Sequence, residues 1–279
     1  MPNLPSIALL GVPFDARSSF LRGTAQGPAA IRVALASPST NTWSESIVDV
    51  GEGRGFIDVG DVVFVDSIDE RQAIESAVDA ALRSAGRVVA LGGDHSVTYP
   101  LVAATHRAYG KFAILHFDAH PDLYPEYEGD PYSHACPLAR ILEDGLTERL
   151  VQVGVRTMND VQRAQADKYG VEVIDMAAWA RGERPSIAGP VYISIDMDGF
   201  DPAFAPGVSH REPGGLSPRD VIAVIQRIQG PIIGADIVEL NPLRDPLDIS
   251  APLAAKLVKE LVARMGTPQE RKPALKSAM

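Results

Sequence analysis

The sequence predicts a single three-layer α/β/α domain with a mainly parallel sheet, and three observations support this prediction. Short runs rich in β-branched residues alternate with longer amphipathic stretches over most of the chain, which is typical of βαβ units. Several of the short runs are almost entirely apolar, as strands are when helices cover both faces of a sheet. With 279 residues, of which 46% are hydrophobic, the chain can build one large core.

The expected elements follow one another without a repeat or a domain-splitting linker. Strands are predicted at residues 7–12, 87–91, 112–117, 150–155, 191–195 and 232–238. Helices are predicted at residues 28–36, 68–85, 98–109, 137–143, 160–169, 218–228 and 251–265. Pro28 and Pro218 suit first helical turns, and Ser217 is a suitable N-cap. We therefore expect one domain over residues 1–266, followed by a mobile tail at 267–279 that is charged and contains prolines.

Composition excludes several classes of function. The formal net charge of -10 argues against binding to nucleic acid or to anionic lipid, and it favours a small cationic partner. Cys136 is the only cysteine, so neither a disulfide scaffold nor a thiolate zinc site can form within the chain. The apolar run at 7–12 is too short to span a membrane. A protein of the cytoplasm is therefore expected.

Acidic residues and histidines follow three of the predicted strands. Asp118, His120 and Asp122 come directly after the strand at 112–117, and residues two apart in an extended chain point the same way. The strand at 191–195 runs into Asp196 and Asp198, and the strand at 87–91 is followed by Gly92, Gly93, Asp94 and His95. Because ligands of parallel sheets bind at the carboxyl edge, these side chains are expected to meet there.

Four carboxylates in one pocket would repel one another unless cations lay between them. Carboxylate and imidazole donors without thiolate suit Mn²⁺ or a related ion. Six candidate ligands are more than one tetrahedral ion takes, so two ions bridged by shared carboxylates are the simpler interpretation. The six are His95, Asp118, His120, Asp122, Asp196 and Asp198.

Simpler interpretations exist for single residues. Taken alone, Asp196 and Asp198 could be turn or cap residues, as Asp at a strand end often is. For His116, packing or contact with a metal ligand is as reasonable as a catalytic role. Asp94 is expected behind the metal ligands, and His106 is expected to be solvated.

These motifs resemble those of the ureohydrolase family, which comprises arginases, agmatinases and related guanidino or formimino hydrolases. The resemblance extends from Gly11–Asp15 and Arg22-Gly23 to the stretch at 235–242. The metal motifs match at 92–96, 118–122 and 194–198, and Ser133-His134-Ala135-Cys136 and the loop at 207–216 are most similar to plant-type arginases and their bacterial relatives. Plant-type enzymes have agmatinase-like sequences yet use arginine, so the resemblance leaves the substrate open.

The resemblance implies an arginase-like fold, two Mn²⁺ ions and a homo-oligomer, a trimer or a hexamer. One ion would bind His95, Asp118, Asp122 and Asp196, and the other would bind His120, Asp118, Asp196 and Asp198. It also implies that His134 shuttles protons and that Glu239 binds the substrate guanidinium. The expected reaction releases urea from L-arginine, giving ornithine, or from agmatine, giving putrescine.

The mechanism that follows uses a water activated by the metals as nucleophile on the guanidino carbon. Asp198 is a candidate to pass a proton to the departing nitrogen. His210 and Arg211 are candidates to meet an α-carboxylate, although both could simply be solvated. Alternatives are another substrate, such as guanidinobutyrate or formiminoglutamate, and a non-catalytic subunit, which the intact His134, Glu239 and ligand set disfavour.

Overall fold

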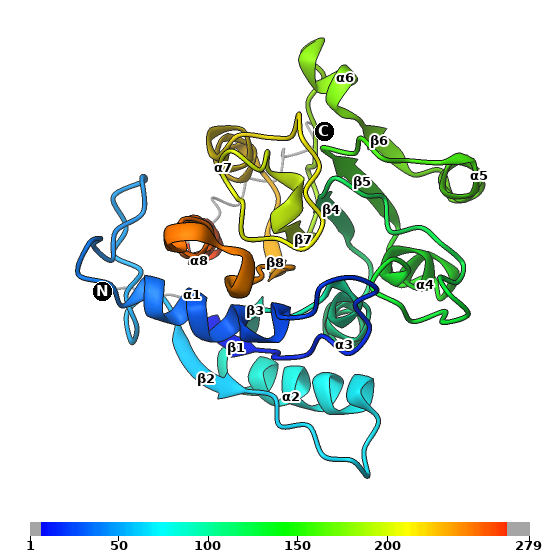
Figure 1. Cartoon of the computed structure of the whole chain (residues 1–279). Coiled ribbons are helices and arrows are strands. Elements are labelled where there is room, and N and C mark those ends of the chain that lie inside the picture. Colours follow the sequence, from blue (N-terminus) through cyan, green and yellow to red (C-terminus); the bar gives the residue numbers. More distant parts are fainter. Residues whose placement is uncertain (1–6, 267–279) are drawn as a thin grey trace, which may run out of the picture.

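In the computed structural model, which describes residues 7–266, eight parallel strands form one sheet in the order β2-β1-β3-β8-β7-β4-β5-β6 (Figure 1). Their bounds are β1 Ile7–Gly11, β2 Ile57–Asp61, β3 Arg87–Leu91, β4 Ala113–Phe117, β5 Arg149–Val153, β6 Glu172–Ile174, β7 Val191–Asp196 and β8 Ile232–Val238.

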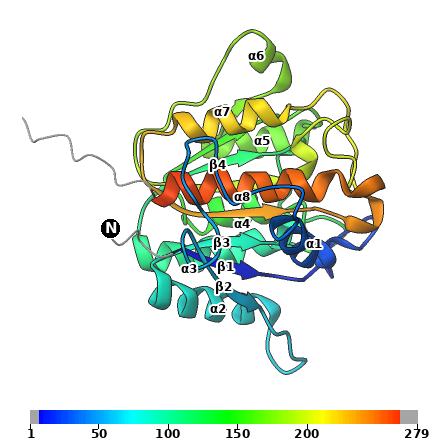
Figure 2. The ribbon, with the colours of Figure 1, turned by 90° about the vertical axis from the view of Figure 1, so that its left-hand side faces the viewer.

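Helices cover both faces of this sheet. One apolar core joins the sheet to α1 Gly27–Leu35, α6 Met176–Ala180, α7 Pro218–Arg227 and α8 Ser250–Gly266. The second core joins it to α2 Glu70–Ala85, α3 Thr98–Tyr109, α4 Pro137–Glu143 and α5 Asp160–Tyr169. Figure 2 shows α8 lying across the sheet, below α7. The predicted three-layer α/β/α fold is therefore confirmed. Within the described residues, no helix is long and apolar enough to cross a membrane.

Helix boundaries follow local chemistry. Asp69 caps α2 by accepting a hydrogen bond from the N–H of Arg71, so the helix predicted from residue 68 begins at Glu70. Ser217 caps α7 in a reciprocal capping box with Asp220, as expected of that serine. Short 3₁₀ helices follow three strands: His95–Val97 after β3, Met197–Gly199 after β7, and Pro242–Arg244 after β8.

Two strands and one helix were not predicted. β2 is an edge strand whose side chains are mostly exposed, and β6, at the opposite edge, has three residues. Edge strands need no continuous apolar run, so periodicity does not reveal them. α6 is a helix of five residues, too short to show a helical repeat. The expected mobile tail at 267–279 lies outside the described residues.

The four strands that carry the polar motifs are neighbours in the middle of the sheet, in the order β3-β8-β7-β4. Their last residues lie level: Leu91 pairs with Ile237, Asp196 with Val238, and Phe117 with Ile195. The segments that follow these strands therefore meet at one carboxyl edge, where ligands of such sheets bind.

Candidate metal centre

Each acidic motif begins with the same local turn, in which an aspartate side chain accepts the N–H of the residue two positions later. This turn bends the chain directly after the strand. The ligands therefore do not converge because the chain stays extended, and the assumption of continued extended spacing is wrong. The turns join Asp94 to Ser96 at 3.1 Å, Asp118 to His120 at 2.6 Å, and Asp196 to Asp198 at 2.8 Å.

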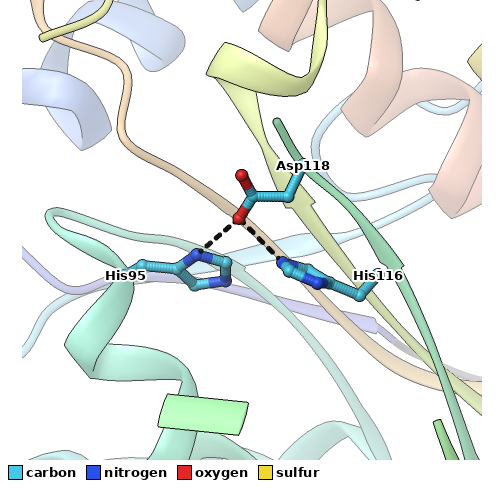
Figure 3. Close-up of side chains that lie close together, drawn as sticks. All are labelled: His95, His116 and Asp118. Carbon is cyan, nitrogen blue, oxygen red and sulfur yellow. Dashed lines mark ion pairs between the residues drawn. The ribbon is translucent and has the colours of Figure 1, made fainter. Parts of the chain in front are cut away.

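Three carboxylates converge on one nitrogen of His95. Its Nδ1 lies 2.9 Å from Asp122 Oδ2, 3.2 Å from Asp196 Oδ2 and 3.3 Å from Asp118 Oδ2. All four residues are buried. Figure 3 shows how His95 and His116 both point toward the same oxygen of Asp118.

A second cluster lies beside the first and shares Asp118 with it. His120 Nδ1 lies 3.3 Å from Asp118 Oδ1 and 3.1 Å from Asp198 Oδ2. Asp118 thus turns Oδ2 toward His95 and Oδ1 toward His120. A carboxylate placed in this way can bridge two cations. The structure brings all six predicted ligands together.

The charges in these clusters favour cations. Burial and the neighbouring carboxylates Asp198 and Asp118 raise the pKa of Asp196 far above its usual value. Burial likewise raises the pKa of Asp198, to about 6. His95 Nδ1, His116 Nε2 and Asp118 Oδ2 are buried and lie close together, and none of them makes a hydrogen bond of regular geometry within the described part of the chain. Oxygen and imidazole donors with such atoms fit hard or borderline divalent ions.

Residues on the Nε2 side of the His95 ring determine which of its two nitrogens carries the proton. The hydroxyl of Ser194 donates to Asp236 Oδ1 at 2.7 Å, so its oxygen is available to accept the Nε2–H of His95 at 3.0 Å. Tyr192 also donates to Asp236, at 2.8 Å. In a neutral ring with its proton on Nε2, Nδ1 keeps its lone pair, and that atom faces the carboxylates.

Glu239 and His134 form a buried pair next to the clusters. Glu239 Oε1 accepts a hydrogen bond from the backbone N–H of His95 at 2.9 Å and lies 3.0 Å from His134 Nδ1. Burial lowers the pKa of His134, but the hydrogen bond and charge of Glu239, with the charges of Asp122 and Asp94, outweigh this effect and raise it to about 9. Conversely, burial raises the pKa of Glu239, but the hydrogen bond and charge of His134, together with the backbone N–H and the charge of His95, lower it below its usual value.

Both ends of the site store backbone strain. Asp122 has φ of 50° and Glu239 has φ of 60°, in the left-handed region that residues other than glycine seldom adopt. Each such residue costs roughly 1–3 kcal/mol, and the surrounding packing must hold it. In this backbone conformation both carboxylates contact His95, Asp122 at the ring Nδ1 and Glu239 at the backbone N–H.

A cavity of about 260 Å³ opens onto these residues. Five carboxylates and no lysine or arginine are among the described residues that line it, so it favours a cation. His210 lies in the wall, with its ring 5.7 Å from that of His120 and 5.4 Å from that of His134. The carboxylates are Asp122, Asp196, Asp198, Glu212 and Glu239.

Arg211, unlike its neighbour His210, does not face the cavity. It is not part of the cavity wall, and its guanidinium donates to the carbonyls of Pro206 and Arg244, each at 2.9 Å. These contacts hold the loop that carries His210. They give no support to the suggestion that Arg211 meets a substrate carboxylate.

Other wall residues are side chains that the sequence did not single out, although some of them lie in loops that it did. Ser19 places its Oγ 2.9 Å from His134 Nε2, and Thr157 and Gln162 follow β5. Tyr124, Tyr127 and Glu212 lie in the loops 123–133 and 199–215, which are rich in glycine, proline and acidic residues. Composition marks such loops as binding segments, but it does not say which side chains face inward.

Arg156 supports the site from outside the cavity wall. Its guanidinium donates to the carbonyl of Asp198 at 2.8 Å and to that of Glu212 at 2.6 Å. It also reaches the carbonyls of Gly154, Gly199 and Phe200. A single side chain thus ties the candidate ligand Asp198 to the loop that follows it.

His106, His116 and Asp94 lie outside the cavity wall, and the structure shows the contacts or the burial of each. His106 is half-buried, and its Nδ1 lies 2.9 Å from the carbonyl of Leu146, so the expectation that it is solvated is wrong. Asp94 is buried behind the clusters, where burial and the charge of Glu239 raise its pKa to about 7. His116 contacts Asp118 and is considered further below.

Gly93 lies at a point of the site where the neighbouring backbone leaves no room for a side chain. A Cβ there would lie 1.8 Å from the carbonyl oxygen of Phe14, and the carbonyl of Gly93 accepts the N–H of Glu239. Gly93→Ala is therefore expected to destabilise the protein by about 3 kcal/mol or more, because backbone must move. Chemical denaturation would measure it. Gly189→Ala, where nothing lies within 4 Å, should be nearly neutral; equal effects of the two would contradict this account.

The fold and the site define a class of three-layer α/β/α enzymes with candidate carboxylate and imidazole metal ligands at the carboxyl edge of a parallel sheet. A family model described as the arginase family matches residues 5–263, and the chain belongs to this family. It is accordingly a hydrolase of linear amidine carbon–nitrogen bonds, as the motifs predicted. The similarity to plant arginases is confirmed by individual relatives.

The mitochondrial arginase of Medicago truncatula is 45% identical over 276 residues, which cover 92% of this chain and 81% of that protein. The solved structure of the arginase from Medicago truncatula superposes with a TM-score of 0.87 at 43% identity, covering 94% of this chain and 88% of that one. N(1)-aminopropylagmatine ureohydrolase of Thermus thermophilus is 39% identical over 246 residues, which cover 85% of this chain and 83% of that protein.

The predicted cytoplasmic location is contradicted by these relatives, because the Medicago truncatula arginase is a mitochondrial protein. The prediction depended on the single Cys136 and on the apolar run at 7–12, which is too short to span a membrane. Cysteine use reports whether a compartment is oxidising, and it does not distinguish one reducing compartment from another.

Proposed function

We propose that this chain is a binuclear manganese hydrolase that releases urea from L-arginine and leaves ornithine. The observation that carries the proposal is the cavity in which the Glu239–His134 pair lies directly beside the two ligand clusters. Its five carboxylates suit a guanidinium substrate. The similarity to plant arginases over most of the chain supports arginine.

Two Mn²⁺ ions would share Asp118 and Asp196. The first would bind these two with His95 and Asp122, and the second would bind them with His120 and Asp198. When bound, the ions would supply Lewis-acid chemistry that lowers the pKa of water from 15.7 to about 7, which generates a nucleophile at neutral pH. Four aspartates would balance their charge.

The remaining steps belong to residues of the cavity wall. Glu239 would hold the guanidinium by charge-assisted hydrogen bonds and turn its carbon toward the metal clusters. Asp198 would pass a proton to the departing nitrogen, since it lines the cavity next to the second cluster. His134 would carry a proton between solvent and the amine product, and its Nε2 faces Ser19.

Agmatine, which would give putrescine, is the second candidate substrate. No arginine or lysine is found among the described residues of the cavity wall, so an α-carboxylate would depend on neutral donors and on His210. Agmatine lacks that carboxylate, and the Thermus thermophilus relative acts on an agmatine derivative by name. Guanidinobutyrate and formiminoglutamate would place a carboxylate in the same wall and are less well matched.

Urea release by the manganese-loaded protein tests the proposal. We expect urea from arginine, with less or none from agmatine, and we expect the activity to vanish in Asp196→Ala, because that carboxylate faces His95. Asp167→Ala, at an exposed position on α5, is the matched control and should keep full activity. Urea from agmatine alone would show that agmatine, and not arginine, is the substrate. Urea from neither would overturn the proposed function.

Assembly and domain limits stay predictions. A homo-oligomer, a trimer or a hexamer, is expected from the family resemblance, and light scattering that gave the mass of a monomer would contradict it. The domain boundary predicted at residue 266 falls at the last residue of α8.

A further inference from the structure

His116 contacts the shared ligand Asp118 yet belongs to neither predicted ligand set. It is fully buried on β4, and both of its ring nitrogens have a neighbour. Nε2 lies 2.9 Å from Asp118 Oδ2, as Figure 3 shows, and Nδ1 lies 3.0 Å from the amide nitrogen of Gln152 on β5. Three groups, His95, His116 and Asp118, could together hold an ion by distance alone.

The neighbours of Gln152 decide how its side-chain amide is oriented. Gln152 is fully buried, and its Nε2 donates to the carbonyl of Pro121 at 2.6 Å as well as facing His116 Nδ1. Reversing the amide would place Oε1 against that carbonyl, and two acceptors at hydrogen-bond distance repel each other. The amide nitrogen therefore faces both groups.

The orientation of the amide sets the proton on His116. An N–H that points at Nδ1 needs a lone pair there, so the proton of a neutral ring is on Nε2. Asp118 Oδ2 lies 2.9 Å from Nε2 and is the acceptor available to that proton, although the N–H is not aligned with it as in a regular hydrogen bond. We propose that His116 is a positioning residue that donates its Nε2–H to Asp118, held in this tautomer by Gln152, and that it is not a metal ligand.

His95 has the opposite arrangement on the same oxygen. Ser194 accepts the Nε2–H of His95, so the Nδ1 lone pair of His95 stays free. In His116 the Nδ1 lone pair instead accepts an N–H from Gln152. One imidazole thus offers Asp118 Oδ2 a proton, and the other offers an electron pair to an ion beside it. The bond from His116 would fix the carboxylate plane so that the remaining lone pairs face the two clusters.

The inference rests on the metal centre proposed above, and its expected effect is on metal affinity. Partners of this kind typically change metal affinity by about 10–100-fold when removed. His116→Leu is expected to weaken manganese binding by that factor. His116→Gln keeps an amide N–H near the position of Nε2, so it is expected to restore most of the affinity.

The test combines two measurements on the full chain. Nitrogen NMR of the metal-free protein, labelled in its histidine rings, reports which nitrogen of His116 carries the proton. Calorimetric titration with Mn²⁺ alone then compares wild type, His116→Leu, His116→Gln and Gln152→Leu. His106→Leu is the matched control, since it removes a half-buried histidine that is bonded to Leu146.

We expect a proton on Nε2 and none on Nδ1 in wild type, and a mixture of tautomers in Gln152→Leu with weaker manganese binding. A proton on Nδ1 in wild type, or equal losses of affinity in His116→Gln and His116→Leu, would overturn the proposal. Should His116→Leu fail to fold, the wild-type spectrum and His116→Gln still decide it. If the wild type bound no manganese, the proposed function would fail, and the spectrum would decide the tautomer separately.

Discussion

Asp118→Ala is expected to lose both metal ions and to lower kcat for urea release by about 10³-fold or more, since metal chemistry supplies several kcal/mol of transition-state stabilisation. Among the ion pairs of residues 7–266, Asp118 alone has its two oxygens divided between the clusters, with Oδ2 near His95 and Oδ1 near His120. Its removal therefore opens both clusters at once. Metal analysis of the dialysed protein and urea assays would measure the two effects.

Two matched variants separate the clusters. Asp122 contacts only the His95 side, and Asp198 contacts only the His120 side, in the ion pairs of the described residues. Asp122→Ala and Asp198→Ala should each retain about one ion per chain under conditions where Asp118→Ala retains none. If Asp118→Ala held as much metal as either of them, the bridging role of Asp118 would be wrong.

The fold was predictable because the signals for it are local. β3, β4, β7 and β8 are mainly apolar runs, and a residue of the site lies at the end of each or within four residues after it, so the strands and the position of the ligands could be predicted together. Their order in the sheet is not a local property. β8 lies between β3 and β7, although much of the chain separates β3 from β8 in sequence.

The backbone conformation of the site and the side chains that support its ligands were not predictable from the sequence. Nothing in the sequence around Asp122 or Glu239 signals a positive φ, since glycine is the usual marker of that region. Arg156 donates only to carbonyls, which every residue possesses, so its role depends on the tertiary path of the loop at 199–215. In the sequence, Gln152 is simply one residue of a predicted strand. Its role depends on its contact with the carbonyl of Pro121, which only the structure shows.

Glu239→Gln is expected to lower kcat/KM for the guanidino substrate by about 30- to 5,000-fold, the equivalent of roughly 2–5 kcal/mol for truncating a buried charged partner. The amide keeps the shape of the side chain and loses its charge. It would bind the guanidinium less strongly, and it would no longer stabilise the charged form of His134. Steady-state urea assays would measure the first effect.

The second effect has its own sign and its own measurement. The pKa of His134 is raised from 6.5 to about 9, mainly by Glu239, against the opposing effect of burial, so the stabilisation from this pair is complete below pH 6.5 and is lost as the pH rises through about 9. In Glu239→Gln that pH-dependent stability should disappear, and NMR titration of the metal-free protein should show a lower pKa for His134. Glu212→Gln is the matched control, because it removes another carboxylate of the cavity wall. An unchanged His134 pKa in Glu239→Gln, or an equal loss of activity in both variants, would show that general negative charge, rather than the Glu239–His134 pair, governs the site.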